Sequence, residues 1–305
     1  MMVATFVIAT LFAAVPSDSS SDDEISAEFF QPTSFIDLFK THEHRYTGGQ
    51  YQDELFKYLL FVPRNLKSGE RCPLLVWLHG FRENGLDDQR SLRWLDLILA
   101  DSDHIEKYRF FILVVQCPPE NSSWFRSMED SPDDMLTVAY DVLQKTMREQ
   151  PIDPDRVYLS GVSSGAGGCW EMAMRYPDVF AAVVPMASSG GDVSRVEKLK
   201  NIPIWVFHNI DDKDSSPAGD MEMTTAIEMA GGNVHLTLCK GRSHDCWNKA
   251  FQMNVMDWML EQRRGSICWT PPGCQPWKWW HLGAVPCAFI VLVWLEWYWV
   301  RRRRK

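Results

Sequence analysis

Short apolar runs alternate with helical stretches between residues 56 and 257. Strands that read as near-continuous apolar runs are typical of sheets buried on both faces, which are mostly parallel. Strands are expected at Leu55–Val62, Leu74–Leu78, Phe110–Val115, Arg156–Ser160, Ala181–Val184, Ile204–Phe207 and Val234–Leu238. Helices are expected at Met135–Glu149, Gly168–Tyr176, Met221–Met229 and Phe251–Gln262. The alternation predicts an α/β fold, with a mostly parallel, doubly wound sheet and helices on both faces.

The N-terminal end has a different character. Residues 3–15 form an apolar run that is interrupted only by Thr5 and Thr10, and Pro16 and a Ser/Asp-rich stretch follow. This pattern is typical of a secretory signal peptide, here residues 1–16, although no Lys or Arg precedes the apolar run. Residues 17–49 are then a lead-in, residues 50–263 the folded domain, and residues 264–281 a linker.

The C-terminal end predicts a membrane anchor. Residues 282–300 contain one charged residue, Glu296, and at 1.5 Å per residue they span about 28 Å, close to the width of one bilayer. Trp residues flank this segment at both ends, and residues 301–305 are all basic, so they are expected to stay cytoplasmic with the domain on the outer side. The alternative is an extension without a stable helix, because Glu296 is costly at membrane depth.

Charge and cysteine spacing exclude some partners. The formal net charge is −9, and because the last five residues are basic, the preceding 300 carry −14. An acidic domain does not favour binding to nucleic acid phosphates. The eight Cys form no CxxC pair and no Cys/His set with zinc spacing, so no metal or other cofactor is expected. Cys239 with Cys246, and Cys268 with Cys274, are close enough for disulfides if the domain is exported, and buried free thiols are the alternative.

The segment Gly161-Val162-Ser163-Ser164-Gly165 carries the strongest chemical signal. It follows a predicted strand and opens a predicted helix, and a nucleophile at such a sharp bend needs small neighbours two residues away on either side. Gly161 and Gly165 meet that need around Ser163. In a register centred on Ser164, Val162 would occupy a position that requires a small residue. A glycine-rich turn for close helix packing is the alternative.

A serine nucleophile needs a base and an acid that orients the base, and in a strand–helix fold of this kind they follow in the order Ser, Asp or Glu, His. His244 is the best base, because it lies in a Gly-containing loop after the last strand. His235 lies within a strand, and His208 ends one and could instead shape the site. The acid is left open among three carboxylates of one loop, Asp211, Asp212 and Asp214.

An oxyanion hole is the third requirement. The N–H of the residue after the nucleophile, Ser164, is one expected donor, and the N–H of Phe81, in the loop after an early strand, is the other. Trp124 is expected to wall the substrate cleft, with a core or surface position as the alternative. His79 is expected near substrate and not on a metal, because no partner ligands accompany it.

Taken together, these segments resemble the α/β-hydrolases of the polyhydroxybutyrate-depolymerase and feruloyl-esterase type, over residues 50–263. The resemblance rests on segments 73–80, 116–119, 158–163, 170–182, 202–208 and 241–245. It implies Ser163 as nucleophile, Asp212 as acid and His244 as base. Arg82 and Asn209 stand where the family usually has Gly, and Ser164-Gly165-Ala166 stands where it has Met-Gly-Gly.

The function expected from the residues and the resemblance is hydrolysis of carboxylic esters through an acyl-enzyme. Small-molecule esters, esters on a polysaccharide and short polyesters are the expected substrates. Two alternatives are a serine peptidase with the same triad and a catalytically silent, anchored binding module.

Overall fold

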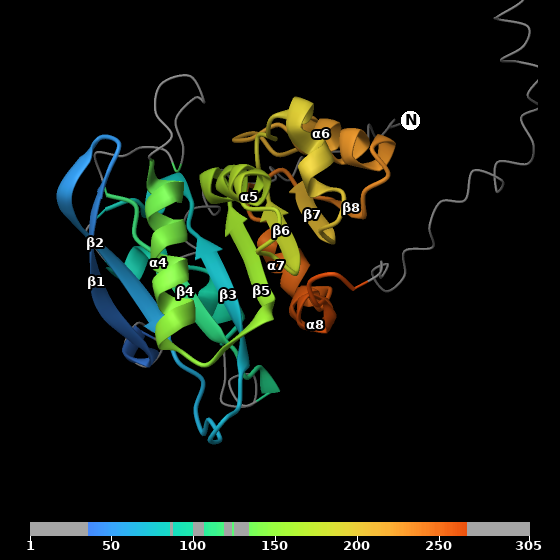
Figure 1. The fold of residues 1–305 in the computed structure, drawn as a ribbon. Helices are drawn as coiled ribbons and strands as arrows, with labels where there is room; N and C mark the ends of the chain where they lie inside the picture. The colour runs from blue at the N-terminus through green and yellow to red at the C-terminus, as the bar shows by residue number, and fades with distance from the viewer. Residues whose placement is uncertain (1–35, 86–87, 100–106, 119–123, 125–133, 267–305) are drawn as a thin grey trace, which may run out of the picture.

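The computed structural model describes residues 36–85, 88–99, 107–118, 124 and 134–266. Within them, eight strands form one sheet in the order β1-β2-β4-β3-β5-β6-β7-β8 (Figure 1). The two pairings β1–β2 and β2–β4 are antiparallel, and the others are parallel. The strands are β1 Phe39–Gly48, β2 Tyr51–Phe61, β3 Cys72–Leu78, β4 Phe111–Val115, β5 Ile152–Val162, β6 Ala182–Met186, β7 Ile204–Asn209 and β8 Val234–Cys239. The predicted fold class, an α/β protein with a mostly parallel sheet, is confirmed.

Side chains of the central strands alternate between two cores. Leu74, Val76 and Leu78 of β3 belong to one apolar cluster, whereas Leu75 and Trp77 belong to the other. The first cluster is covered by α4 Met135–Glu149, α5 Ser164–Arg175, η4 Val193–Leu199 and α6 Ala218–Met229. The second is covered by η3 Leu95–Leu97, α7 Trp247–Gln252 and α8 Val255–Glu261. Helices therefore lie on both faces, as a two-residue alternation in doubly buried strands requires.

Strand β1 is a difference from the sequence expectation, because it lies in the segment expected to be a lead-in. It pairs with β2 along its length, from Phe39 opposite Phe61 to Gly48 opposite Tyr51, and forms the edge of the sheet. Its exposed positions are polar or charged, and such residues protect an edge strand from pairing with other chains. The same polarity gives β1 no apolar run by which to recognise it.

Ion pairs fix α5, the helix that follows the predicted nucleophile. Asp134 accepts the N–H groups of Leu136 and Thr137 at the start of α4, and its two carboxylate oxygens each lie 2.8 Å from a guanidinium nitrogen of Arg175 at the end of α5. Glu171 pairs with the same Arg175 at 2.7 Å and with Arg195 of η4 at 2.7 Å. This buried network holds three helical segments on one face of the sheet.

The described cysteines, Cys72, Cys117, Cys169, Cys239 and Cys246, are buried free thiols, so the possible Cys239–Cys246 disulfide is wrong and the alternative holds. No helix among the described residues is long and apolar enough to span a bilayer. The predicted signal peptide, residues 1–16, and the predicted anchor, residues 282–300, both lie outside the described residues.

Candidate active site

Ser163 lies at a sharp bend between β5 and α5. Its backbone has φ 55° and ψ −121°, a positive φ that is uncommon and strained for a residue other than Gly. The bend is held from both sides, because the Ser163 N–H donates to the Met186 carbonyl at 2.9 Å and the Ser163 carbonyl accepts the Ala166 N–H at 3.0 Å. The strand–turn–helix bend expected from the sequence is therefore present, with Ser163 at its apex.

The two glycines beside Ser163 are required because the backbone approaches closely. A Cβ added to Gly165 would lie 2.1 Å from the Leu78 carbonyl oxygen and 2.5 Å from that of His79. One added to Gly161 would lie 2.6 Å from the same Leu78 oxygen. The end of β3, which leads into the loop of Phe81, therefore lies directly against the bend of Ser163.

Replacing Gly165 with Ala is expected to lower the free energy of unfolding by about 3 kcal/mol, because the added methyl meets fixed backbone atoms. Gly168→Ala in the same helix is the matched control. Its Cβ meets side chains of Leu78 and Trp124 at 3.0 Å and beyond, and Ala favours a helix, so a change within about 1 kcal/mol is expected. Urea unfolding of the two variants measures the difference, and equal losses would refute the close approach.

The loops after β7 and β8 bring an acid and a base together. His244 Nδ1 lies 2.6 Å from Asp212 Oδ2, with the Asp212 side chain fully buried and that of His244 17% exposed. Asp212 Oδ1 accepts the N–H groups of Asp214 and Ser215 at 2.9 and 3.1 Å. One carboxylate oxygen thus shapes its own loop while the other orients the imidazole. Of the three carboxylates that the sequence left open, Asp212 makes this bond, whereas Asp211 and Asp214 are exposed.

An open cleft of about 750 Å³ lies at this edge of the sheet. Four of the residues predicted from the sequence line it: Phe81, Ser163, Ser164 and His244. Other charged and aromatic residues on its wall include Arg82, Glu83, Arg93, Trp94, Asp214, Asp245 and Trp247. The cleft therefore gathers the predicted nucleophile, base and oxyanion donors from segments that are far apart in the sequence.

An aromatic wall beside His244 was not predicted. The Trp247 ring lies edge-on to His244 with centroids 5.8 Å apart, and Trp94 lies 4.9 Å from Trp247. Arg93 lies over the Trp94 ring, 4.4 Å from its centroid. The position of Trp247, three residues after the predicted base, was a signal for it, but nothing in the sequence around Trp94 pointed to the cleft.

His79 stabilises the loop of Phe81, the expected oxyanion donor, from the side opposite the cleft. Its Nε2 accepts the Cys117 N–H at 3.1 Å, so the ring hydrogen is on Nδ1, which donates to the Gly80 carbonyl at 2.9 Å. In a trans peptide the N–H of Phe81 points away from the carbonyl of Gly80, so this bond orients the N–H as well. His79 fixes the donor although its ring is not on the cleft wall.

Trp124 supports the same loop. Its indole N–H donates to the His79 carbonyl at 2.8 Å, and its side chain is 1% exposed. Neither Trp124 nor His79 is among the residues that line the cleft. Their contacts are with the loop that carries Phe81, and the substrate contact that the sequence suggested for both stays a prediction.

Glu83 also stabilises the loop of Phe81, through its side chain and its backbone carbonyl. Burial raises the pKa of its carboxyl, while the positive charge of Arg93 and the N–H of Gly80 act in the opposite direction. The Glu83 carbonyl accepts a hydrogen bond from Gln116 Nε2 at 3.1 Å. Gly80 is therefore held at both of its backbone groups. Its carbonyl accepts from His79, and its N–H donates to the Glu83 carboxylate.

Acid is expected to destabilise the fold through His79. Burial lowers its pKa to about 4, well below the ordinary 6.5, so the unfolded chain takes up the proton first as the pH falls. About 3 kcal/mol of stability should be lost between pH 6.5 and pH 4. His79→Gln removes the titrating group, so the free energy of unfolding of this variant should fall less steeply over that range. Equal slopes for the two proteins would contradict the assignment.

Asn209 ties the acid loop to the base loop. Its amide donates to the Ser243 carbonyl at 2.7 Å and to Asp245 Oδ1 at 3.1 Å, both beside His244. The residue stands where the resembling family usually has Gly, and Gly241 leaves room for it, since a Cβ there would lie 3.0 Å from the Asn209 side chain. This departure from the pattern therefore adds a link between the two loops.

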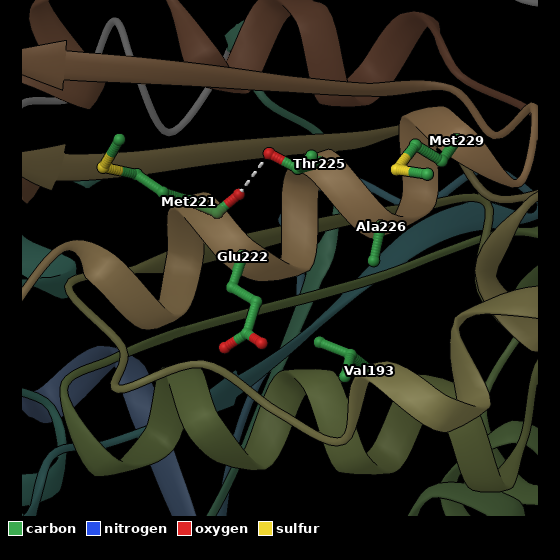
Figure 2. Close-up of a pocket in the computed structure, with 6 residues that line it drawn as sticks. All are labelled: Val193, Met221, Glu222, Thr225, Ala226 and Met229. Atoms are coloured by element: carbon green, nitrogen blue, oxygen red, sulfur yellow. Dashed lines mark hydrogen bonds between the residues drawn. The ribbon is translucent and has the colours of Figure 1, made fainter. Parts of the chain in front are cut away.

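A second, smaller pocket lies elsewhere, between η4 and α6 (Figure 2). Ala226 and Glu222 of α6 point toward Val193 of η4, and Met221, Thr225 and Met229 of the same helix complete the lining. The Thr225 hydroxyl is already bonded to the Met221 carbonyl at 2.8 Å.

No group of three or more His, Cys, Asp or Glu side chains in the described part of the chain is placed to hold a metal ion.

Comparison with known proteins gives consistent results. The model of the Esterase PHB depolymerase family matches residues 56–194. A poly(3-hydroxyalkanoate) depolymerase C of Paucimonas lemoignei is 29% identical over 140 residues, which are 44% of this chain and 31% of that protein. The crystal structure of a thermostable esterase superposes with a TM-score of 0.68 and 31% identity, covering 75% of this chain and 64% of that one. A ferulic acid esterase has the same fold, with a TM-score of 0.57 at 15% identity, over 73% of this chain and 98% of that one.

The sheet order, the bend at Ser163 and these similarities define an α/β-hydrolase fold. Residues 56–194, just under half of the chain, are similar to the Esterase PHB depolymerase family. The matched segment contains Ser163 and the loop of Phe81 but ends before Asp212 and His244. The chain spans about a third of its depolymerase relative and just under two thirds of the thermostable esterase.

Proposed function

We propose that this chain is a serine hydrolase that cleaves carboxylic esters with Ser163 as nucleophile, His244 as base and Asp212 as acid. The observation that carries the proposal is the 2.6 Å bond from His244 Nδ1 to Asp212, made where His244 and Ser163 line one cleft. Because Nδ1 holds its hydrogen toward Asp212, Nε2 is the nitrogen left to accept a proton from a serine hydroxyl.

The reaction follows from these roles. Ser163 Oγ attacks the ester carbonyl carbon as His244 Nε2 takes its proton, and Asp212 stabilises the imidazolium that forms. The N–H groups of Phe81 and Ser164 donate to the oxyanion, and one such donor contributes about 3 kcal/mol to transition-state stabilisation. His244 returns the proton to the leaving alcohol, and water then releases the acyl group by the same route. Three side chains and two backbone N–H groups thus share these steps with the attacking water.

The proposed substrates are short polyesters, aryl esters or esters on a polysaccharide. The depolymerase relative, named for poly(3-hydroxyalkanoate), supports the first class. The apolar N-terminal run and the Trp-flanked C-terminal segment support export, with attachment to a membrane. The acidic net charge does not favour a nucleic acid partner.

A panel of chromogenic substrates tests the reaction class. p-Nitrophenyl esters of acetate, butyrate and ferulate, and a hydroxybutyrate oligomer, are expected to be hydrolysed, whereas peptide p-nitroanilides are not. Turnover of anilides without turnover of esters would replace the esterase proposal with a peptidase. No turnover of either class, together with a folded protein, would favour a binding module.

A further inference from the structure

Behind Asp212 lies a second, fully buried histidine–carboxylate pair that the proposed reaction does not use. His208, at the end of β7, and Asp220, in the first turn of α6, both have side chains that are 0% exposed. The segments that carry them, with α5 and β6, lie side by side on this half of the sheet (Figure 1). A buried ionisable pair is costly to desolvate, so the reason for its presence has to be sought in its contacts.

The contacts of Asp220 are those of an ionised carboxylate. Oδ1 accepts the indole N–H of Trp170 at 3.0 Å and the hydroxyl of Ser188, and Oδ2 accepts the backbone N–H of Ser188 at 3.1 Å. Oδ2 also lies 2.8 Å from His208 Nδ1. A protonated acid would have to donate one hydrogen bond, but these partners from α5 and from the loop after β6 all donate.

The two ring nitrogens of His208 both face acceptors. Nδ1 faces the Asp220 carboxylate, and Nε2 lies 3.0 Å from the Ser215 carbonyl oxygen. A carbonyl oxygen can only accept, so Nε2 carries hydrogen, and with Asp220 ionised Nδ1 carries one too, which makes the ring an imidazolium. Burial alone lowers the pKa of His208, but the hydrogen bond and charge of Asp220, with help from Ser215 and Asp212, outweigh it and raise the pKa overall.

This cation lies next to the acid of the proposed triad. His208 Nε2 is 3.7 Å from Asp212 Oδ2, the oxygen that binds His244. It also anchors Ser215, whose N–H binds the other oxygen of Asp212 at 3.1 Å. The Cys246 thiol, just before α7, feels the charges of Asp220 and Asp212 and stays neutral, because burial raises its pKa well above the ordinary value. His208 is therefore the cation among two buried carboxylates.

We propose that His208 is a positioning residue of the catalytic site: a protonated imidazole, anchored by Asp220, that balances the buried charge of Asp212 and holds the Asp212 loop against His244. The inference rests on the proposed function. Without this cation, two buried carboxylates would face each other, and His244 would hold its own proton to higher pH. The positive charge that forms on His244 in the transition state would then lie beside more negative charge than in the unaltered protein.

His208→Gln tests the role in the full-length protein. We expect kcat for a p-nitrophenyl ester to fall about tenfold with KM within about twofold, and the acid limb of the kcat/KM pH profile to move up by about half a unit or more. His208→Gln/Asp220→Asn removes both charges and should return the acid limb to its original position. His235→Gln, on the neighbouring strand β8, is the matched control and should leave kcat and the acid limb unchanged.

The outcomes separate this inference from the proposed function. The role of His208 would be overturned, and the esterase left intact, by an active His208→Gln variant whose acid limb does not move. The same would follow if His208→Gln/Asp220→Asn shifted the acid limb as far as His208→Gln alone. An unaltered protein that hydrolyses no ester would refute the esterase and the positioning role together. The ¹⁵N spectrum of the unaltered protein tests the charge state even if the variants do not fold: two ring N–H groups on His208 from pH 6 to 8 support the proposal, and one overturns it.

Discussion

Ser163→Ala is expected to lower kcat for ester hydrolysis by about 10⁵- to 10⁶-fold and to leave KM close to its original value. The hydroxyl is the atom that forms the acyl-enzyme, whereas the cleft that binds substrate and the two oxyanion N–H groups remain. Alanine keeps the Cβ that Ser163 already places at φ 55°, so the bend is expected to fold unchanged.

Steady-state kinetics on p-nitrophenyl butyrate measure the effect. Ser194→Ala, at an exposed position in η4, is the control and should retain full activity. Circular dichroism and the thermal midpoint verify that Ser163→Ala is folded. More than about one per cent residual activity in a folded Ser163→Ala variant would mean that another group is the nucleophile.

Asp212→Asn is expected to lower kcat by about 10⁴-fold through the wrong tautomer of His244. The N–H groups of Asp214 and Ser215 require an acceptor at Oδ1, so the amide oxygen must occupy that place. The NH₂ group then faces His244 Nδ1 and donates to it. The ring hydrogen moves to Nε2, which can no longer accept the proton of Ser163.

Asp211→Asn is the matched control, because Asp211 is the exposed neighbour in the same loop and its backbone N–H is bonded to Gly241. Activity within about twofold is expected for it. If Asp211→Asn or Asp214→Asn lost as much activity as Asp212→Asn, the acid would be assigned to the wrong carboxylate, or the loop would matter only as a whole.

The sequence predicted best those elements whose pattern and packing agree. Helix α4 begins and ends where it was expected, because its apolar face, its Asp134 cap and its length all point to the same boundaries. Helix α5 begins at Ser164, four residues before the expected start, because its glycine-rich first turn has poor helix propensity but packs tightly against β3. The single helix expected at Phe251–Gln262 is two helices, α7 and α8, separated at Asn254, which adopts a left-handed φ of 58°.

The sequence predicted the chain order of the candidate site residues and the edge of the sheet where they meet, but not their side-chain contacts. Parallel strands bring their carboxyl ends to one edge, so the loops holding Ser163, Asp212 and His244 could be expected there together. The choice of Asp212 over its neighbours depends on the turn that points one carboxylate inward, and residues alone did not show that turn. The Arg93–Trp94–Trp247 wall and the His208–Asp220 pair depend on contacts between segments remote in sequence, which no local pattern reveals.

Labelling with a fluorophosphonate, followed by mass spectrometry of the digested protein, tests the central claim most directly. The account predicts one adduct, on Ser163, formed by the unaltered protein and by Asp211→Asn, slowed strongly in Asp212→Asn and absent in Ser163→Ala. An adduct on another residue, or no adduct on a folded protein that still hydrolyses esters, would contradict it.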